Sequence, residues 1–248
     1  LVRLVGAEQV IADRDGRRAF ETDGLSAYRR MPLAVVLARS TEDVSKVMAY
    51  ANTGGIKVIA RGAGTSLSGG ALPTEDAIVL GLSRMNRVLD IDYANRTARV
   101  QTGITNLGIT GAVAPKGFFY APDPSSQLAC SLGGNIAFNS GGAHCLKYGV
   151  TTNNVLGLKI LLARGEIVDI GGNWLDQPGY DLLGLIVGSE GQLGIVTEAT
   201  VRILRQAEGA RPLLLGFNSS EAAGRAVAAI IGAGIIPVAM EVMDRPAI

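Results

Sequence analysis

The sequence predicts an α+β fold, in which helices and strands are mixed. Short apolar runs of strand length, such as LAVVL at 33–37 and IKVIA at 56–60, are separated by a segment with helical periodicity. Glycines, 33 in all, gather at 62–70, 133–149 and 184–194, as expected of loops that approach a ligand rather than of linkers. Hydrophobic residues make up 48% and charged residues 18%, so the 248 residues can bury a substantial core.

Residues 33–60 form the clearest unit, a strand followed by a helix and a second strand. Ser40 or Thr41 is a good N-cap ahead of an acidic first turn, and Gly54-Gly55 stops the helix. Both flanking runs are apolar throughout, which is typical of strands that are buried on both faces. Such a β-α-β unit predicts two parallel strands joined by a right-handed crossover.

The middle of the chain continues with strands and short helices. A helix is predicted at 106–114, and strands are predicted at 77–82, 88–92, 97–101, 155–163 and 166–170. Residues 184–204 lead into a long strand whose second half, TEATVRI, alternates between polar and apolar residues.

The C-terminal residues predict a further unit. LLLGF from residue 212, a capped helix at 219–231 and VAMEVM together indicate another β-α-β unit, so we expect a domain boundary at 207–211. The first residue is Leu rather than Met, and the chain ends at EVMDRPAI without a closing element. We therefore expect a piece of a longer protein.

The bulk composition excludes several function classes. A net charge of +1 argues against a nucleic-acid groove and against a polybasic membrane patch. No run approaches the roughly 18 apolar residues that span a membrane, and no signal-peptide n-region is present. The spacing of Cys130 and Cys145 fits neither a zinc nor an iron–sulfur pattern. We expect two free thiols in a reducing cytoplasm and no metal, with a disulfide as the alternative.

The glycine-rich stretch RGAGTSLSGG at 61–70 follows a predicted strand and suits a phosphate group. It lacks the third glycine of the dinucleotide fingerprint, where Leu67 stands, and Gly70 replaces the lysine of a nucleoside-triphosphatase loop. A serine-hydrolase site is disfavoured because His144 is the one histidine. What remains is a loop of backbone N–H donors that can hold a diphosphate without turnover, or a glycine-rich turn that serves chain geometry alone.

Three motifs in order carry a family resemblance: RGAGTSLSGGALP (61–73), APDPSSQLACSLGGNIAFNSGGAHCLKYGV (121–150) and GSEGQLGIVTEATV (188–201). They resemble the FAD-linked oxidase family of the vanillyl-alcohol oxidase type, and within it the group of glycolate oxidases, D-lactate dehydrogenases and D-2-hydroxyglutarate dehydrogenases. The resemblance implies a FAD-binding domain at 1–206, with α+β subdomains at about 30–101 and 102–206 and FAD between them. Residues 207–248 would begin a truncated α+β cap domain that holds the substrate.

The resemblance also implies the cofactor contacts. The first loop would wrap the pyrophosphate with backbone amides, the second would line the pyrophosphate and flavin, and the third would flank the adenosine part. The implied residues are Arg61, Gly62, Ala63, Gly64, Thr65, Ser66, Gly69, Gly70, Pro122, Asp123, Ser125, Gly133, Gly134, Asn135, Ala137, Ser140, Gly141, Glu190, Gly191, Ile195 and Val196.

Some of these residues have a purely structural alternative. Asn135 and Asn139 can instead cap the helix that begins near Ser131, and Asp123 or Glu190 can merely organise a turn. His144 is the one catalytic candidate, because its loop position would let it approach the flavin or a substrate carboxylate. The first loop contains no histidine, so FAD is expected to bind non-covalently.

The implied function is oxidation of a small 2-hydroxy acid, glycolate or D-lactate, to the 2-oxo acid, with hydride transfer to flavin N5. Electrons would pass to an iron–sulfur subunit or a quinone, and a partner would bring the cytoplasmic protein to the inner face of the membrane. The fragment is expected to be inactive alone. The alternative is a non-catalytic flavin-binding subunit of an oxidase complex.

Overall fold

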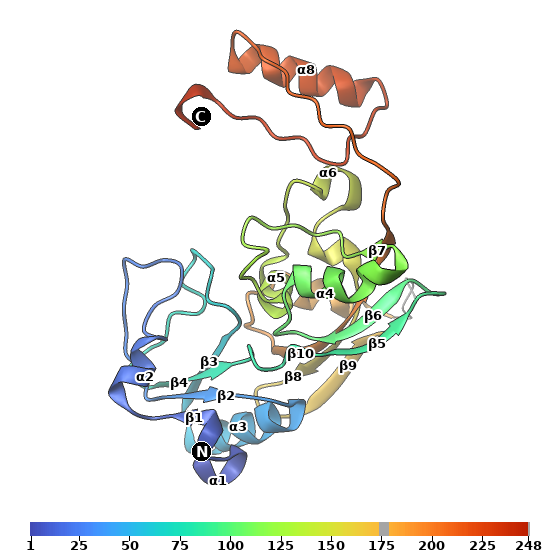
Figure 1. Cartoon of the computed structure of the whole chain (residues 1–248). Coiled ribbons are helices and arrows are strands. Elements are labelled where there is room, and N and C mark those ends of the chain that lie inside the picture. Colours follow the sequence, from blue (N-terminus) through green and yellow to red (C-terminus); the bar gives the residue numbers. More distant parts are fainter. Residues whose placement is uncertain (174–178, 248) are drawn as a thin grey trace.

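The computed structural model describes residues 1–173 and 179–247 and contains two main sheets (Figure 1). The first sheet has the strand order β1-β2-β4-β3. Strand β1 is antiparallel to β2, whereas β2, β4 and β3 are parallel. The strand bounds are Val10–Ile11 for β1, Ala34–Leu37 for β2, Ala77–Gly81 for β4 and Lys57–Arg61 for β3.

The predicted β-α-β unit is present, with one difference in its pairing. Helix α3 (Thr41–Gly54) begins at the N-cap Ser40, whose hydroxyl accepts a hydrogen bond from the Asp43 N–H, and ends at Gly55 in the left-handed conformation. The strands on either side are parallel to each other, but β4 lies between them. Strand β3 is consequently an edge strand and is half-buried, not buried on both faces as the sequence predicted.

The second sheet is antiparallel, with five strands in the order β5-β6-β10-β8-β9. Its strands are β5 (Val88–Asp92), β6 (Thr97–Gln101), β10 (Ile195–Arg202), β8 (Val155–Leu161) and β9 (Ile167–Gly171). Because β10 is the central strand, most of its residues are buried. The predicted alternation of polar and apolar residues does not give alternating burial, since Glu198 and Arg202 are the half-buried residues of the strand. The sheets divide between Gly81 and Val88, earlier in the chain than the expected division at 101 and 102.

Short helices form in the segments that connect the strands of the second sheet. They are α4 (Asn106–Val113), α5 (Leu132–Phe138), α6 (Cys145–Tyr148) and α7 (Leu182–Ile186), and the strands β7 (Phe118–Phe119) and β11 (Leu204–Arg205) pair nearby. Near the N-terminus lie α1 (Val2–Val5) and α2 (Arg14–Arg18). The predicted helix at 106–114 and the helix start near Ser131 are confirmed. Both cysteines are free thiols.

Helix α3 joins the two sheets. The Thr41 hydroxyl donates to the Thr197 hydroxyl at 3.0 Å in a buried position, and Ser45 Oγ donates to the Gly165 carbonyl at 2.7 Å. Leu161 of β8 and Ile195 of β10 belong to the same buried core cluster as the first sheet. The two sheets are therefore held in a fixed relation along one side of α3.

The C-terminal residues differ from the sequence prediction. Helix α8 (Ser220–Gly232) forms with Ser219 as its N-cap, but neither LLLGF nor VAMEVM forms a strand. Leu213 and Leu214 are 84% and 95% exposed, and Figure 1 shows this segment (orange to red) apart from the two sheets. A strand needs a hydrogen-bonding neighbour, and the described residues offer these runs none. No described helix is both long and apolar enough to cross a bilayer.

Candidate cofactor-binding cleft

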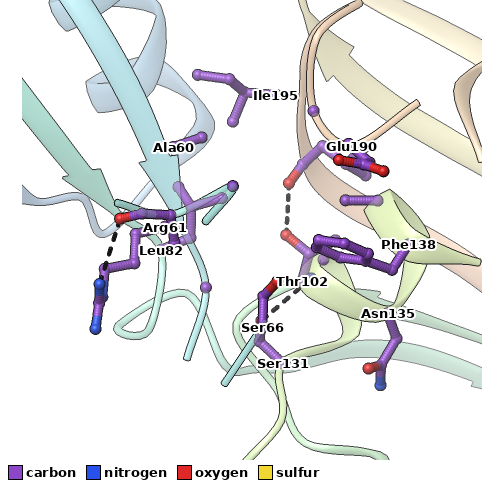
Figure 2. A pocket seen from close by; sticks show the side chains of 18 of the residues that line it. Ala60, Arg61, Ser66, Leu82, Thr102, Ser131, Asn135, Phe138, Glu190 and Ile195 are labelled. Atoms are coloured by element: carbon purple, nitrogen blue, oxygen red, sulfur yellow. Dashed lines mark hydrogen bonds between the residues drawn. The ribbon is translucent and has the colours of Figure 1, made fainter. Parts of the chain in front are cut away.

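A cleft of about 860 Å³ lies between the two sheets (Figure 2). Figure 2 shows Ala60 and Arg61 on one side and Phe138 and Glu190 on the other. Most sequence-predicted contact residues line it: Arg61, Gly62, Ala63, Gly64, Thr65, Ser66, Gly70, Ser125, Gly133, Gly134, Asn135, Ala137, Ser140, Gly141, Glu190, Gly191, Ile195 and Val196.

The first loop leaves β3 at the carboxyl end of a parallel strand, where open sheets place their ligands. Gly64 and Gly69 turn it with positive φ angles of 74° and 78°, which side chains with a Cβ rarely adopt. Among the described residues, the backbone N–H groups of residues 62 to 66 have no hydrogen-bond acceptor. Consecutive free N–H groups in a glycine-rich turn are a binding site for an anion such as a diphosphate.

The start of α5 lies directly against this loop. A Cβ on Gly62 would collide with Ser131 Oγ, so only glycine permits the contact. Ser131 caps the helix, with its hydroxyl accepting from the Gly134 N–H at 3.2 Å. The Gly133 N–H donates to the Thr102 carbonyl at 2.8 Å, and the Thr102 hydroxyl donates to the Val196 carbonyl at 2.6 Å. Thr102 thus fixes α5 to β10.

Asn135 is buried and organises the second loop. Its side-chain amide donates to Asn106 Oδ1 at 2.9 Å, and the Asn106 amide donates to the Pro122 carbonyl at 2.8 Å. Asn135 therefore does not cap the helix, which Ser131 does. Asn139 ends α5 in the left-handed conformation, with φ of 51°, so the capping alternative holds for that residue.

The third loop docks on the other end of α5. The Gly188 N–H donates to the Ile136 carbonyl at 2.9 Å and the Glu190 N–H donates to the Ala137 carbonyl at 2.8 Å. Glu190 has a φ of 53°, an uncommon conformation for a residue with a side chain. These bonds hold residues 188–190 at the cleft wall by main-chain contact.

Three expected contact residues do not line the cleft: Gly69, Pro122 and Asp123. Gly69 turns the loop, while the other two support the second loop from outside. His144 also lies off the cleft lining, with Nδ1 3.3 Å from Asp123 Oδ2. The cleft instead includes Leu82, Thr102 and Phe138, which have no distinctive sequence signal because single apolar or hydroxyl residues are common after strands and in helices.

The cleft is electrically almost neutral. Among its described lining residues, Arg61 and Glu190 are the charged side chains. Burial lowers the pKa of the Arg61 guanidinium, and the nearby Asp23 carboxylate opposes that shift. Figure 2 shows the Arg61 side chain extending away from Phe138 and Glu190. A bound diphosphate would therefore be held by neutral N–H groups.

These features fit a flavin dinucleotide. The free N–H groups of the first loop suit its diphosphate, and apolar side chains such as Val58, Phe138 and Ile195 offer walls for its rings. Gly62 on one side of the cleft and Gly133 and Gly134 on the other allow the backbone to approach a ligand closely.

Comparison with known proteins agrees with this fit. Residues 32–171 match a protein family that is described as "FAD binding domain". The glycolate oxidase subunit GlcD of Escherichia coli (strain K12) is 52% identical over 226 residues, which are 91% of this chain and 45% of that protein. GlcD of Bacillus subtilis (strain 168) is 43% identical over 247 residues, 99% and 53% of the two chains. A D-lactate dehydrogenase of Archaeoglobus fulgidus is 38% identical over 242 residues, 97% and 54%.

Among solved structures, alkyldihydroxyacetonephosphate synthase matches with a TM-score of 0.81 at 24% identity, over 94% of this chain and 44% of that one. This likeness concerns the fold, and it confirms the predicted α+β architecture. The chain spans about half the length of the curated relatives it matches. The protein belongs to the family of FAD binding domains that matches residues 32–171, and its cofactor is FAD.

Proposed function

We propose that the protein takes part in the FAD-dependent oxidation of a small 2-hydroxy acid, glycolate or D-lactate, to the 2-oxo acid. The observation that carries this proposal is a cleft built for a flavin dinucleotide in a chain 52% identical to a glycolate oxidase subunit. The relative named D-lactate dehydrogenase supports the same substrate class. Bound FAD supplies the acceptor for the hydride that leaves the substrate Cα.

The chain's own share of this reaction is to bind and orient the cofactor. The N–H groups of residues 62 to 66 would hold the diphosphate, and the glycines of α5 together with Ser140, in the loop after that helix, would lie toward the flavin side. The third loop would contact the adenosine part through its main chain. No substrate base is assigned within the described cleft lining, whose ionisable side chains are Arg61 and Glu190.

We further propose that the reduced cofactor passes its electrons to a partner, either an iron–sulfur subunit or a quinone. The name "subunit" in the similar proteins supports an assembly with other chains. In this proposal the protein works in the cytoplasm, at the inner face of the membrane through its partner.

The second candidate function is a non-catalytic flavin-binding subunit of such a complex. The cleft is compatible with it, since a flavin site is what both candidates require. This candidate shares the FAD site and differs only in whether substrate reduces the flavin.

Anaerobic mixing separates the two candidates. The FAD-loaded full-length protein is mixed with glycolate, D-lactate, L-lactate or D-2-hydroxyglutarate, and the visible flavin absorbance is followed. Rapid bleaching by glycolate or D-lactate supports the proposal; the two differ by one methyl group, which a pocket resolves by about 1–3 kcal/mol. Bleaching only by an alcohol or an amine contradicts the substrate class. A bound flavin that no substrate reduces favours the non-catalytic subunit.

A further inference from the structure

A segment near the N-terminus packs behind the first glycine-rich loop. Arg61 begins that loop, and its Nη1 donates to the Thr22 carbonyl at 2.7 Å and to the Ala71 carbonyl at 3.4 Å. Its guanidinium also lies 5.6 Å from the centre of the Phe20 ring. The hydrogen bonds and the aromatic contact of the guanidinium are therefore made with residues 20–25 and with Ala71, just after its own loop.

Two glycines allow this packing to be close. An added Cβ on Gly24 would stand 2.6 Å from the Ser66 carbonyl oxygen and 2.7 Å from that of Thr65, so the segment touches loop backbone directly. An added Cβ on Gly64 would collide with the Arg61 guanidinium. The loop is thus held between its cleft side and a rear layer made by Arg61 and residues 20–25.

Asp23 lies at the centre of the rear layer. It is 6% exposed, and its Oδ1 accepts from the Leu25 N–H at 2.9 Å. Its Oδ2 is buried and has no hydrogen-bond partner among the described residues. A buried carboxylate without compensation is costly. The Arg61 guanidinium is held beside this carboxylate by its hydrogen bond to the neighbouring Thr22 carbonyl, and Asp23 opposes the lowering of the Arg61 pKa by burial.

We propose that Asp23 and Arg61 form a positioning pair that sets the shape of the first loop for the FAD diphosphate from behind. Arg61, although it begins the phosphate loop, then acts through the backbone of residues 62 to 66 rather than as a phosphate ligand. The pair keeps those N–H groups in the arrangement that a dianion needs, without bringing a mobile cation into the cleft. This inference rests on FAD as the cofactor and not on the substrate or the electron acceptor.

The test measures the dissociation constant for FAD by calorimetric titration of apoprotein. Asp23→Asn keeps the Oδ1 acceptor and removes the charge, Arg61→Lys keeps the charge and loses the planar set of donors, and Gly24→Ala pushes on the loop carbonyls. Each is expected to raise the dissociation constant about tenfold or more. Asp23→Asn combined with Arg61→Lys should cost less than the product of the two single effects, because both break one pair.

Matched controls separate positioning from general damage. Glu8→Gln removes a carboxylate that pairs with Arg39 outside the rear layer, and Gly224→Ala adds a Cβ in open space. Both should bind FAD like the wild type. Thermal unfolding of each apoprotein shows that it is folded, and Asp23→Asn carries the test if Gly24→Ala does not fold.

Two results would overturn the proposal. One is wild-type FAD affinity in Arg61→Lys together with a large loss in Arg61→Met, which would mean that the cationic charge itself serves the phosphates. The other is wild-type affinity in both Asp23→Asn and Gly24→Ala. Neither result bears on which acid is oxidised, so the proposed function and this inference can fail separately.

Discussion

Asp123 binds His144 at two points, and the contact joins two loops of the cofactor cleft. Asp123 Oδ1 accepts a hydrogen bond from the His144 backbone N–H at 3.0 Å, while Oδ2 lies 3.3 Å from His144 Nδ1. The backbone at Gly142 approaches Asp123 so closely that an added Cβ would collide with its carbonyl. His144 therefore has a structural partner and is not among the residues that line the cleft, which makes it a poor candidate for substrate chemistry.

Asp123→Asn is expected to weaken FAD binding several-fold. The amide keeps an acceptor for the His144 N–H but removes the carboxylate that faces His144 Nδ1, so the loops that carry Ser125 and Ser140 are held less tightly. The measurement is the FAD dissociation constant of the apoprotein. Asp169→Asn is the control, because it breaks an ion pair with Lys159 outside the cleft lining. Equal FAD affinity in the two variants would contradict a role for the Asp123 contact.

Gly64→Val is expected to abolish FAD binding. The residue has a φ of 74°, and a side chain there would strike the Arg61 guanidinium and displace the N–H groups of the loop. Gly55→Val is the matched control, since Gly55 has a φ of 63° with open space around it at the end of α3. Both variants carry backbone strain, but only Gly64→Val should lose flavin absorbance after purification. Full flavin occupancy in Gly64→Val would mean that this loop is not the diphosphate site.

Local features of the fold could be predicted because neighbouring residues encode them. Ser40 and Gly55 mark the two ends of α3, and Ser131 marks the start of α5. Sheet membership could not be predicted in the same way. The pairing of β6 with β10 joins segments far apart in the sequence, and neither strand carries a signal for its partner. The expected division of the subdomains at about residue 101 stays a prediction.

The same contrast applies to the cleft. Its glycine-rich loops could be recognised because close backbone approach requires glycine at particular positions, such as Gly62 against Ser131. Thr102 and the rear segment around Asp23 could not be recognised, since their roles come from tertiary contacts with α5 and the first loop. The apolar runs beside α8 show the converse, because strand-like composition forms no strand without a neighbour.

Thr197→Val is expected to lower the free energy of unfolding by about 1–3 kcal/mol, because it leaves the buried Thr41 hydroxyl without its partner. Thr41→Val combined with Thr197→Val should cost less than the sum of the single changes, since both hydroxyls are then gone. Urea unfolding of the apoprotein measures the effect. Thr53→Val, at an exposed hydroxyl on the same helix, is the control and should change stability less. Strict additivity of the two buried changes would show that the hydroxyl pair does not couple α3 to β10.

We expect denaturation of the protein to release FAD as the unmodified, free cofactor. A covalent link to the flavin needs a nucleophilic side chain in the cleft, and the one histidine of the chain, His144, lies outside the lining and faces Asp123. Cys130 and Cys145 are also outside the described lining. Acid precipitation of the yellow protein should therefore release all the flavin into the supernatant, where chromatography identifies it as FAD. Flavin that stays with the pellet, or a supernatant that contains FMN, would contradict non-covalent FAD and require a different assignment of the cleft.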